Sequence, residues 1–485
     1  MGASVRHVLE AGLCTACGTC LGLCPRGALE GRWDLDEGLA IRVIDEHCTE
    51  CGICDRACPG EELDLPGLRD RFLGPLAWRS DEPFTPPALP LSSDGELAPE
   101  PDEVALWSGM SDRDFVGSYR RCYCGWAADD ALRYRGSSGG AATAILLGAL
   151  ETAFIDGALV TAMDPERPLE PLSFLATTAD ELLGAVGSKY TVTYPNRLFR
   201  DVLRPGKRYA FVGVPCQVEG LRKAQAAVPA LRRAFVLVLG LFCGTTYTPR
   251  GTFVGMRRSG LQPEEVVSVA YRGDGWPGAF RLTTRWGEVR EVAYPDYLDP
   301  WFSSHIRARC LVCPDGTNEL ADIALGDAWL DRFTRPRTTG ASFLIARSPL
   351  AVRLLSALEP QWIRLEAVDD EEIVAAQRET HEVKRAGVRG NLWLRRVTGR
   401  ALPRFAGLDL EATRRERWSA LAASLKRGFY RAAGRVRYRY RPLDEGNGRS
   451  PAAPTGLNWR RDTAPARGRP PTTTASASGG PGEGV

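Results

Sequence analysis

The sequence predicts a mixed α/β domain, preceded by a small cysteine-rich α+β domain and followed by a disordered tail. Eight of the fourteen cysteines lie within the first sixty residues, and strand-like and helix-like segments alternate further along the chain. The C-terminal residues are mainly Pro, Gly, Ser, Thr and Ala, with few large apolar side chains to form a core. The predicted regions are a cysteine-rich domain at 1–66, a linker rich in Pro and acidic residues at 67–103, the α/β domain at 104–395, an arginine-rich helical extension at 396–440 and the tail at 441–485.

The N-terminal cysteines form two copies of one motif, with three cysteines at intervals of three residues and a fourth followed by proline. This is the bacterial ferredoxin spacing, in which the fourth cysteine of each run ligates the other cluster. Gly18 and Gly52 fall inside the turns, where the backbone must pass close to a cluster. The motif therefore predicts two 4Fe-4S clusters in a ferredoxin-like dicluster domain. The predicted ligands are Cys14, Cys17, Cys20 and Cys58 for the first cluster, and Cys24, Cys48, Cys51 and Cys54 for the second.

Spacing and composition argue against a zinc site or a disulfide framework at this motif. Zinc sites use four ligands, usually in pairs, rather than a duplicated run of four. A disulfide framework needs an oxidising compartment, and residues 1–13 contain no apolar stretch of signal-peptide length. The 62 basic residues nearly balance the 60 acidic ones, so no general attraction to nucleic acid is expected. We expect a soluble, cytoplasmic protein with no transmembrane segment and no nucleic-acid partner.

Between residues 104 and 395 the hydrophobic pattern alternates between buried strands and helices. A predicted antiparallel meander, with a turn at Gly287-Glu288, interrupts this alternation, so we expect a mixed sheet. The predicted strands are 155–163, 208–214, 235–241 and 321–325, the predicted helices are 141–151, 218–226 and 350–358, and the predicted meander strands are 266–271, 280–286 and 289–294.

Four further cysteines lie near the ends of predicted strands. Cys216 and Cys243 each follow a strand, and the pair Cys310 and Cys313 precedes one. Strand ends at one edge of a sheet converge, so these four can meet around one cluster. Spacing alone leaves open a zinc site, a redox pair or ordinary buried thiols. The two remaining cysteines lack the cluster spacing and are predicted to be free or packing thiols: Cys122 and Cys124.

A glycine- and serine-rich segment at 135–143 leads into the predicted helix 141–151. Free backbone N–H groups at a helix start suit a phosphate, although many glycine-rich loops are simple turns. A flavin dinucleotide beside iron–sulfur clusters is chemically sensible, because a flavin accepts two electrons from a hydride donor and releases them singly. The segment therefore indicates a candidate flavin site.

Several short motifs lie between about residues 115 and 330. They are Arg135-Gly-Ser-Ser-Gly-Gly, Ile155-Asp-Gly-Ala, Gly187-Ser-Lys-Tyr, Gly213-Val-Pro-Cys-Gln, Gly220-Leu-Arg-Lys, Phe242-Cys-Gly, Cys310-Leu-Val-Cys with Asp315, and Asn318-Glu-Leu-Ala-Asp-Ile-Ala-Leu-Gly-Asp-Ala-Trp. Together these motifs resemble the coenzyme F-420 hydrogenase/dehydrogenase beta-subunit family. This family includes subunits of F-420-dependent hydrogenases and formate dehydrogenases, and 7-hydroxymethyl chlorophyll a reductase.

The resemblance implies FAD at the glycine-rich loop and a third iron–sulfur cluster in the α/β domain. It implies that Lys189 lies near the flavin, where an ammonium stabilises an anionic reduced ring. The chain has five lysines against 57 arginines, which favours a specific role for Lys189 over a surface salt bridge. The implied FAD-binding residues are Ser137, Ser138, Gly139, Gly140, Thr143 and Lys189, and the implied ligands of the third cluster are Cys216, Cys243, Cys310 and Cys313.

We therefore expect a FAD- and 4Fe-4S-dependent oxidoreductase that passes electrons between a hydride-carrying substrate, such as coenzyme F-420, and an electron-transfer protein or redox subunit. Two alternatives stay open: a ferredoxin-dependent reductase of an organic substrate, and a non-catalytic electron-transfer subunit of a larger complex. No general acid stands out, and His305 is a candidate because it lies close to Cys310 in the sequence. The helix predicted within 411–435 either docks on a partner or an anionic surface, or packs on the domain as a solvated helix.

Overall fold

The computed structural model describes residues 5–74, 115–334, 339–406 and 411–438. The predicted tail at 441–485 and residues 75–103 of the predicted linker lie outside the described residues. The first part of that linker belongs to a helix, α4 (Leu65–Phe72), which begins with Asp64 as its N-cap.

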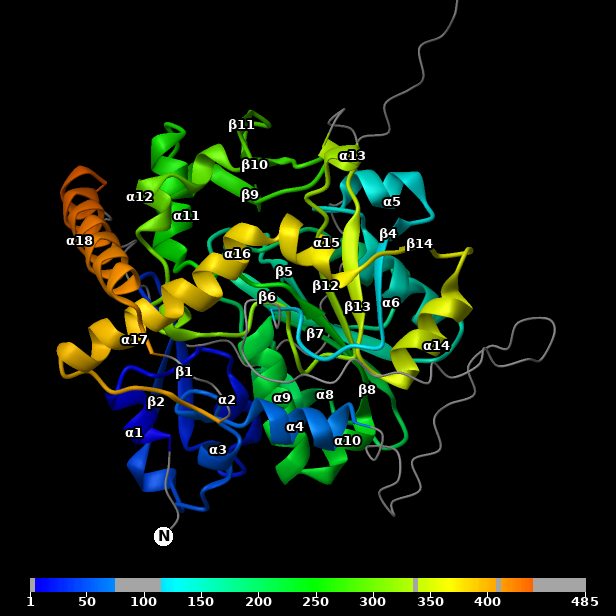
Figure 1. The fold of residues 1–485 in the computed structure, drawn as a ribbon, viewed down its shortest axis with the longest axis horizontal. Helices are drawn as coiled ribbons and strands as arrows, with labels where there is room; N and C mark the ends of the chain where they lie inside the picture. The colour runs from blue at the N-terminus through cyan, green and yellow to red at the C-terminus, as the bar shows by residue number, and fades with distance from the viewer. Residues whose placement is uncertain (1–4, 75–114, 335–338, 407–410, 439–485) are drawn as a thin grey trace, which may run out of the picture. The chain divides into compact units, whose positions relative to one another are not determined.

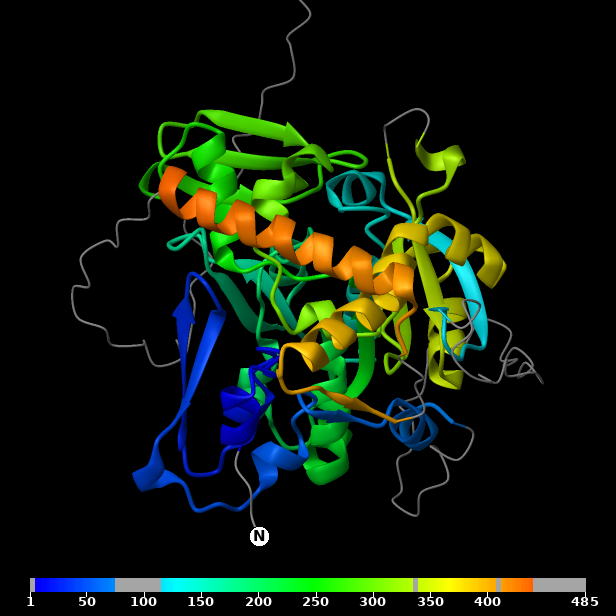
Figure 2. The same cartoon turned by 60° about the vertical axis from the view of Figure 1, so that its left-hand side comes forward.

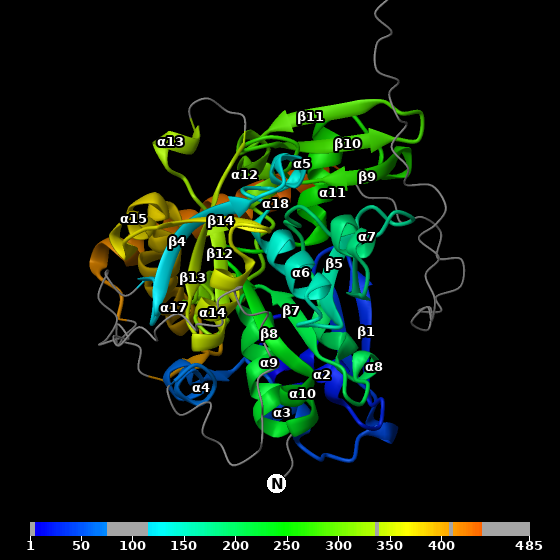
Figure 3. The ribbon, with the colours of Figure 1, turned by 90° about the vertical axis from the view of Figure 1, so that its right-hand side faces the viewer.

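An eight-stranded mixed sheet forms the centre of the fold (Figures 1 and 3), in the order β14-β4-β13-β12-β8-β7-β5-β6. The neighbours β12, β8, β7 and β5 run parallel, and the outer strands are antiparallel to their neighbours. The predicted mixed α/β fold is thus confirmed. The strands are β4 (Arg121–Ala127), β5 (Gly157–Met163), β6 (Pro171–Ala176), β7 (Tyr209–Gly213), β8 (Phe235–Leu241), β12 (Ile323–Asp327), β13 (Ser342–Ala346) and β14 (Ile363–Ala367).

Helices cover both faces of this sheet, as the nearly continuous apolar sequence of its central strands requires. On one face α6 and α14 pack against one hydrophobic core, and on the other face α8, α9 and α10 pack against a second core. The helices of the α/β region up to α14 are α5 (Asp130–Arg135), α6 (Ala141–Glu151), α7 (Ala179–Gly184), α8 (Phe199–Val202), α9 (Pro215–Ala227), α10 (Pro229–Ala234), α11 (Pro249–Arg258), α12 (Pro300–Ser303), α13 (Asp331–Thr334) and α14 (Pro349–Leu358), with short 3-10 turns at Pro195–Leu198, Pro263–Glu265, Asp296–Leu298 and Cys310–Val312.

The predicted meander forms a separate three-stranded sheet, in the order β11-β10-β9 (Figure 3). Its strands are β9 (Val266–Ala270), β10 (Ala279–Thr284) and β11 (Val289–Ala293). Gly287 adopts the left-handed conformation, with φ of 81°, in the turn before β11. Residues of the meander, α11 and α12 share a third hydrophobic core.

The N-terminal module is small and packs on the α9 side of the sheet. Its apolar residues Leu23, Leu63 and Leu65 belong to the same core as α9, so the module and the α/β domain share one hydrophobic interior. Its elements are α1 (Arg6–Glu10), α2 (Thr19–Leu23), the antiparallel strands β1 (Leu29–Asp34) and β2 (Gly38–Val43), a 3-10 turn (Asp45–His47), α3 (Ile53–Arg56) and β3 (Glu62–Leu63).

The C-terminal region returns to the N-terminal module, because β15 (Arg404–Phe405) pairs in parallel with β3. A π-helical turn, η8 (Val383–Gly387), interrupts the helices of this region. Gly390 allows α17 and α18 to cross closely, since a Cβ there would lie 2.5 Å from the Glu416 carbonyl oxygen. Among the described residues, none of the helices combines the length and low polarity of a membrane-spanning segment. The remaining helices are α15 (Asp370–Ala376), α16 (Arg378–Glu382), α17 (Val388–Val397) and α18 (Arg414–Arg437).

Candidate functional site

The eight N-terminal cysteines surround two cavities, four around each. The grouping corresponds to the crosswise spacing of the motif, in which the fourth cysteine of each run joins the other set. Apolar side chains, including Val8 and Ile41 at one cavity and Leu29 and Val43 at the other, complete the walls. One cavity is lined by Cys14, Cys17, Cys20 and Cys58, and the other by Cys24, Cys48, Cys51 and Cys54.

Local backbone conformation explains how these short runs enclose a cavity. Gly18 and Gly52 are the left-handed N-caps of α2 and α3, with φ of 82° and 71°, and each turns the chain between the second and third cysteine of its run. Backbone N–H groups also point at the sulfurs: Gly60 N lies 3.3 Å from Cys58 Sγ, and Ala28 N lies 3.2 Å from Cys24 Sγ. Such donors favour negatively charged sulfur, which is the form that ligates a cluster.

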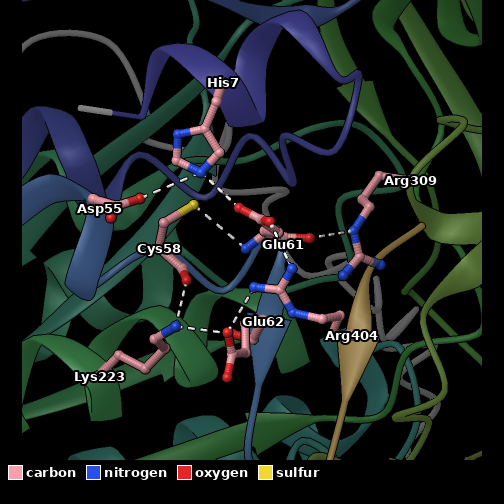
Figure 4. Close-up of polar contacts among 9 residues, drawn as sticks. His7, Asp55, Cys58, Glu61, Glu62, Lys223, Arg309 and Arg404 are labelled. Carbon is pink, nitrogen blue, oxygen red and sulfur yellow. Dashed lines mark hydrogen bonds and ion pairs between the residues drawn. The ribbon is translucent and has the colours of Figure 1, made fainter. Parts of the chain in front are cut away.

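Basic side chains of the α/β domain donate hydrogen bonds to the backbone of the cysteine-bearing loops. Arg307 donates to the Cys14 carbonyl at 3.0 Å, and Arg200 donates to the Cys24 carbonyl. Figure 4 shows Lys223 of α9, whose Nζ donates to the carbonyl oxygens of Cys58 at 2.6 Å and Glu62 at 2.8 Å. Sequence reasoning missed these contacts, since each joins residues more than 160 positions apart.

A polar cavity lies beside Cys58 (Figure 4), between the N-terminal module, α9 and β15. Its charged groups neutralise one another: His7 Nε2 lies 2.5 Å from Glu61, and Arg404 bridges Glu61 and Glu62 at 3.0 and 2.8 Å. These pairs fix the segment that follows the last cysteine of the second run. The cavity is thus part of the junction between the module and the α/β domain.

The four cysteines of the α/β domain also converge. Cys216 lies in the first turn of α9 after β7, Cys243 follows β8, and Cys310 begins a 3-10 turn that Cys313 caps before β12. Burial raises the pKa of the Cys216 thiol, and charges on Cys310 and Cys313 raise it further. The same two cysteines add to the effect of burial on Cys243, whose pKa is about 12. Cys216 and Cys243 therefore each lie within electrostatic range of Cys310 and Cys313.

Asn318 joins the loops that carry these cysteines. It is fully buried with φ of 60°, and its Nδ2 donates to the carbonyl oxygens of Gly213 at 2.9 Å and Leu241 at 3.3 Å, at the ends of β7 and β8. Asp315 Oδ1 accepts from the Asn318 backbone N–H at 2.7 Å. Asn318 therefore ties the ends of two parallel strands to the loop that follows Cys313.

Lys384, on the π-helical turn η8, is buried against the same cysteine set. It is 1% exposed, and a Cβ on Gly316 would lie 3.1 Å from its Cγ. Burial alone would lower the pKa of its ammonium, but the thiols of Cys313 and Cys243 more than offset this and raise it. The neighbouring Arg385 anchors the turn by donating to the Pro314 carbonyl at 2.7 Å. Lys384 is one of the five lysines of the chain, and its position near the cysteines could not be predicted from the sequence.

The three cysteine sets are neighbours in space. A charge on Cys54 raises the pKa of the Cys20 thiol, although burial has the larger effect, so the two N-terminal sets adjoin. A charge on Cys17 likewise adds to the effect of burial on Cys216, so the first set adjoins the set in the α/β domain.

The glycine-rich loop predicted to bind FAD lies between α5 and α6. Ser137 Oγ accepts from the Ser188 N–H at 2.7 Å, and Ser138 Oγ lies 2.7 Å from Ser342 Oγ. Gly139 N donates to Ser342 Oγ at 3.2 Å. Gly140 is a left-handed N-cap with φ of 69° and makes no side-chain cap bond to α6, whose first turn contains half-buried Thr143.

Lys189 is half-buried and follows Ser188, which is bonded to this loop. Its Nζ donates to the carbonyl oxygens of Ala185, Val186 and Gly187, and burial lowers its pKa to about 7. The next residue, Tyr190, receives a hydrogen bond of 3.2 Å from Arg272 Nη1.

Arg272 is the centre of an aromatic cluster that sequence reasoning did not find. Its guanidinium forms an ion pair with Asp327 and donates to the Ser137 carbonyl and, at 2.8 Å, to the Pro277 carbonyl. It lies over three aromatic rings, 4.5 Å from the Tyr294 centroid, 5.0 Å from Trp276 and 5.5 Å from Trp329. Arg272 thus links the glycine-rich loop to the end of β12.

Three further predicted residues have other surroundings. Cys122 and Cys124 are buried in β4, where burial raises both thiol pKa values to about 12. His305 is 6% exposed beneath α18, and burial together with Arg431 and Arg250 lowers its pKa to about 4. His305 is therefore neutral at neutral pH and is enclosed by packing residues.

The donor sets fit iron–sulfur clusters and a flavin. In the described part of the chain, no three Cys, His, Asp or Glu side chains converge as tightly as ligands of a single metal ion do. Each N-terminal set instead leaves a cavity between four thiols. At the glycine-rich loop, the uncapped start of α6 suits a phosphate, and the buried Trp276 Nε1, beside Ser138, has no hydrogen-bond partner among the described residues.

This fold and the cysteine-rich module define a redox protein of the oxidoreductase class. Residues 6–59 match the 4Fe-4S dicluster domain, residues 122–198 match the N-terminal part of the coenzyme F-420 hydrogenase/dehydrogenase beta subunit, and residues 206–371 match its C-terminal part. The chain belongs to the coenzyme F-420 hydrogenase/dehydrogenase beta-subunit family, as the sequence motifs predicted.

Individual relatives give the extent of the similarity. The coenzyme F-420 hydrogenase subunit beta of Methanothermobacter thermautotrophicus is 31% identical over 235 residues, which are 45% of this chain and 78% of that protein. The chloroplastic 7-hydroxymethyl chlorophyll a reductase of Oryza sativa is 28% identical over 227 residues, 45% of this chain and 46% of that protein. A chain of the F-420-reducing nickel–iron hydrogenase complex from Methanosarcina barkeri is 21% identical, with a TM-score of 0.48, and the match covers 62% of this chain and 99% of that one.

Proposed function

We propose that this chain is a FAD- and 4Fe-4S-dependent oxidoreductase that connects a hydride-carrying substrate, such as coenzyme F-420, to a one-electron partner. The observation that carries the proposal is that eight cysteines line two cavities, four around each, with four further cysteines within electrostatic range, together with a glycine-rich loop that leads into α6 without a side-chain cap. When bound, FAD would accept two electrons as a hydride, and the clusters would carry single electrons.

The residues of the chain have distinct roles in this proposal. Each of the three sets, with Cys216, Cys243, Cys310 and Cys313 as the third, would hold one 4Fe-4S cluster. Ser137, Ser138, Gly139, Gly140 and Thr143 would hold the flavin at the start of α6. Lys189 would lie beside it, where an anionic reduced ring would favour the charged ammonium over the neutral amine that burial favours.

Cofactor analysis of the anaerobically purified chain tests the assignment. We expect about twelve irons and about twelve acid-labile sulfides, the content of three four-iron clusters, together with one FAD. Cys216→Ser should lower the iron content by about one third and leave the ferredoxin-like clusters in place. Cys124→Ser is the matched control, because Cys124 is a buried thiol in β4 outside the three sets, and its iron content should stay unchanged. A full iron content in Cys216→Ser, or a chain without FAD, would contradict the proposal.

The similarity to the rice reductase supports a second candidate function, the reduction of an organic substrate with electrons from ferredoxin. In that case electrons would flow inward through the N-terminal module. Turnover assays separate the two: reduced coenzyme F-420 should reduce a viologen dye in the first case. Reduced ferredoxin should drive turnover of a hydroxymethyl or double-bond substrate in the second, with no reaction of F-420. If isolated, fully loaded chain reacts with neither donor, the chain is an electron-transfer subunit that needs a separate catalytic protein.

A further inference from the structure

The helix α18 lies outside the residues that match the family domains, and one of its faces is covered by the rest of the chain. Figures 1 and 2 show it along one side of the molecule, over α12 and α17. Its inner face is held by Arg431, which donates to the carbonyl oxygens of Ser304 and, at 2.6 Å, Ile306, and by the close crossing at Gly390. The helix is therefore fixed to the domain, with its orientation defined.

The outer face of α18 carries a straight apolar stripe. Trp418, Leu425, Phe429 and Val436 are 61%, 68%, 66% and 71% exposed. They follow one another at intervals of seven, four and seven residues, so they project within an arc of about 40° around the helix axis and extend over about 27 Å. These four are among only ten large hydrophobic residues that are exposed in the described part of the chain, so the concentration on one helix face is distinctive.

Basic residues border this stripe and no acidic residue interrupts it. Glu416, the one acidic residue of α18, is turned inward and paired with Arg389 at 2.6 Å. Six basic side chains of the helix are exposed: Arg414, Arg415, Arg417, Lys426, Arg435 and Arg437. A second copy of the chain would bring two such cationic helices together, which electrostatic repulsion opposes.

We propose that α18 is a membrane-surface anchor that lies parallel to an anionic lipid bilayer, with the stripe formed by Trp418, Leu425, Phe429 and Val436 inserted among the lipid headgroups. An interfacial helix of this kind has aromatic and aliphatic residues on one side and Lys and Arg at its borders. An anionic bilayer provides apolar and negatively charged contacts together along the whole helix, on both borders of the stripe. The inner face of α18 stays packed on the domain, so insertion requires no unfolding.

Vesicle flotation of the full-length, cofactor-loaded chain tests this inference. We expect binding to vesicles of phosphatidylcholine with roughly one third phosphatidylglycerol, and little binding to phosphatidylcholine alone. Binding should weaken as salt rises through about 0.1 M, where charges are screened over about 10 Å. Changing the four stripe residues to Gln should reduce binding more than about tenfold.

One control and two charge variants keep the test specific. Trp286→Gln with Val289→Gln removes exposed apolar residues from the meander, 68% and 49% exposed, and should leave vesicle binding unchanged. Lys426→Gln and Arg435→Gln should each weaken binding about fivefold, the effect of about 1 kcal/mol for each basic residue at such a surface. These variants alter exposed side chains, and unchanged iron and FAD contents would show that the domain is intact.

Three outcomes would overturn the inference. The first is an absence of binding to anionic vesicles at low salt, and the second is equal binding of the stripe variant and the parent chain. The third is that the parent chain binds an acidic protein subunit but no vesicles, and that the stripe variant does not bind this subunit. This result would show that α18 docks on protein. Because cofactor content and vesicle binding are measured separately, failure of the proposed redox function would leave this result unaffected.

Discussion

Substitution of Arg272 tests the connection between the glycine-rich loop and the sheet. The guanidinium is 1% exposed as a side chain, and it contacts Asp327, the Ser137 carbonyl and the Pro277 carbonyl at the same time. Arg272→Met removes all of these donors but keeps much of the apolar volume beneath the aromatic rings. Removal of one partner from a buried ion pair costs about 3–5 kcal/mol. Because the side chain of Asp327 is 23% exposed and gains water, we expect about 3 kcal/mol.

The reciprocal change, Asp327→Asn, leaves the buried guanidinium charged, because arginine does not lose its proton in proteins. We expect Asp327→Asn to lower the free energy of unfolding by about 3–5 kcal/mol. In the double variant, the loss should be smaller than the sum of the losses in the two single variants. Arg272→Lys should recover part of the ion pair but not the contacts to Pro277 and Ser137, which need the planar guanidinium.

Urea denaturation of matched holoprotein samples, together with FAD retention after gel filtration, measures these effects. If one half of the lost stabilisation is lost from the FAD-binding form of the loop, the dissociation constant of FAD rises by about tenfold, because about 1.4 kcal/mol corresponds to a factor of ten. A change below about 1 kcal/mol in Arg272→Met, with normal FAD retention, would refute the view that this ion pair organises the loop.

Three other substitutions test separate parts of the structure. Asn318→Ala leaves two strand-end carbonyls without their buried donor, so it should cost about 1–3 kcal/mol and lower the occupancy of the third cluster, measured as iron per chain. Lys384→Met should lower the reduction potential of that cluster by on the order of 100 mV in an EPR-monitored titration, because a buried positive charge favours the reduced form, while Lys426→Met should leave it unchanged. The pKa of His305 is about 4 in the folded chain and about 6.5 in the unfolded chain. Between these two pH values the unfolded chain binds a proton that the folded chain does not, so the free energy of unfolding falls as the pH drops. The expected loss is about 1 kcal/mol at pH 5.5. His305→Leu should flatten this part of the stability profile between about pH 7 and 5, and an unchanged slope would contradict the reasoning.

The features that could be predicted from the sequence are those with a local signature. The strands β5, β7, β8 and β12 are apolar runs between turn residues, and the meander shows alternation with a glycine turn, so both were found within a few residues. The strands β4, β6, β13 and β14 were missed. For example, β4 carries Cys122, Cys124 and Trp126 rather than a β-branched run, and it is defined by pairing with β13 and β14, more than 200 residues away.

The same distinction applies to the candidate site. The cysteine motif encodes its own local geometry, whereas the groups that support it come from distant parts of the chain. Lys223 reaches Cys58 across 165 positions, and Lys384 approaches the third set only because η8 folds back over the loop at Pro314. The scarcity of lysine in this arginine-rich chain was the signal in the sequence that pointed to specific lysine roles. It led to a predicted role for Lys189 alone, although Lys223 and Lys384 are also held by specific groups.

Burial along the three cysteine sets indicates where a protein partner would exchange electrons under the proposed function. Cys51, in the second N-terminal set, is exposed, whereas Cys17 and Cys20 of the first N-terminal set are buried. The four cysteines of the third set are half-buried. Since Cys51 is the exposed thiol among the twelve, a partner should dock at the loop around Cys51. Because α18 packs on α12 and α17, away from this loop (Figure 1), a membrane-bound α18 would leave the loop around Cys51 accessible to a partner.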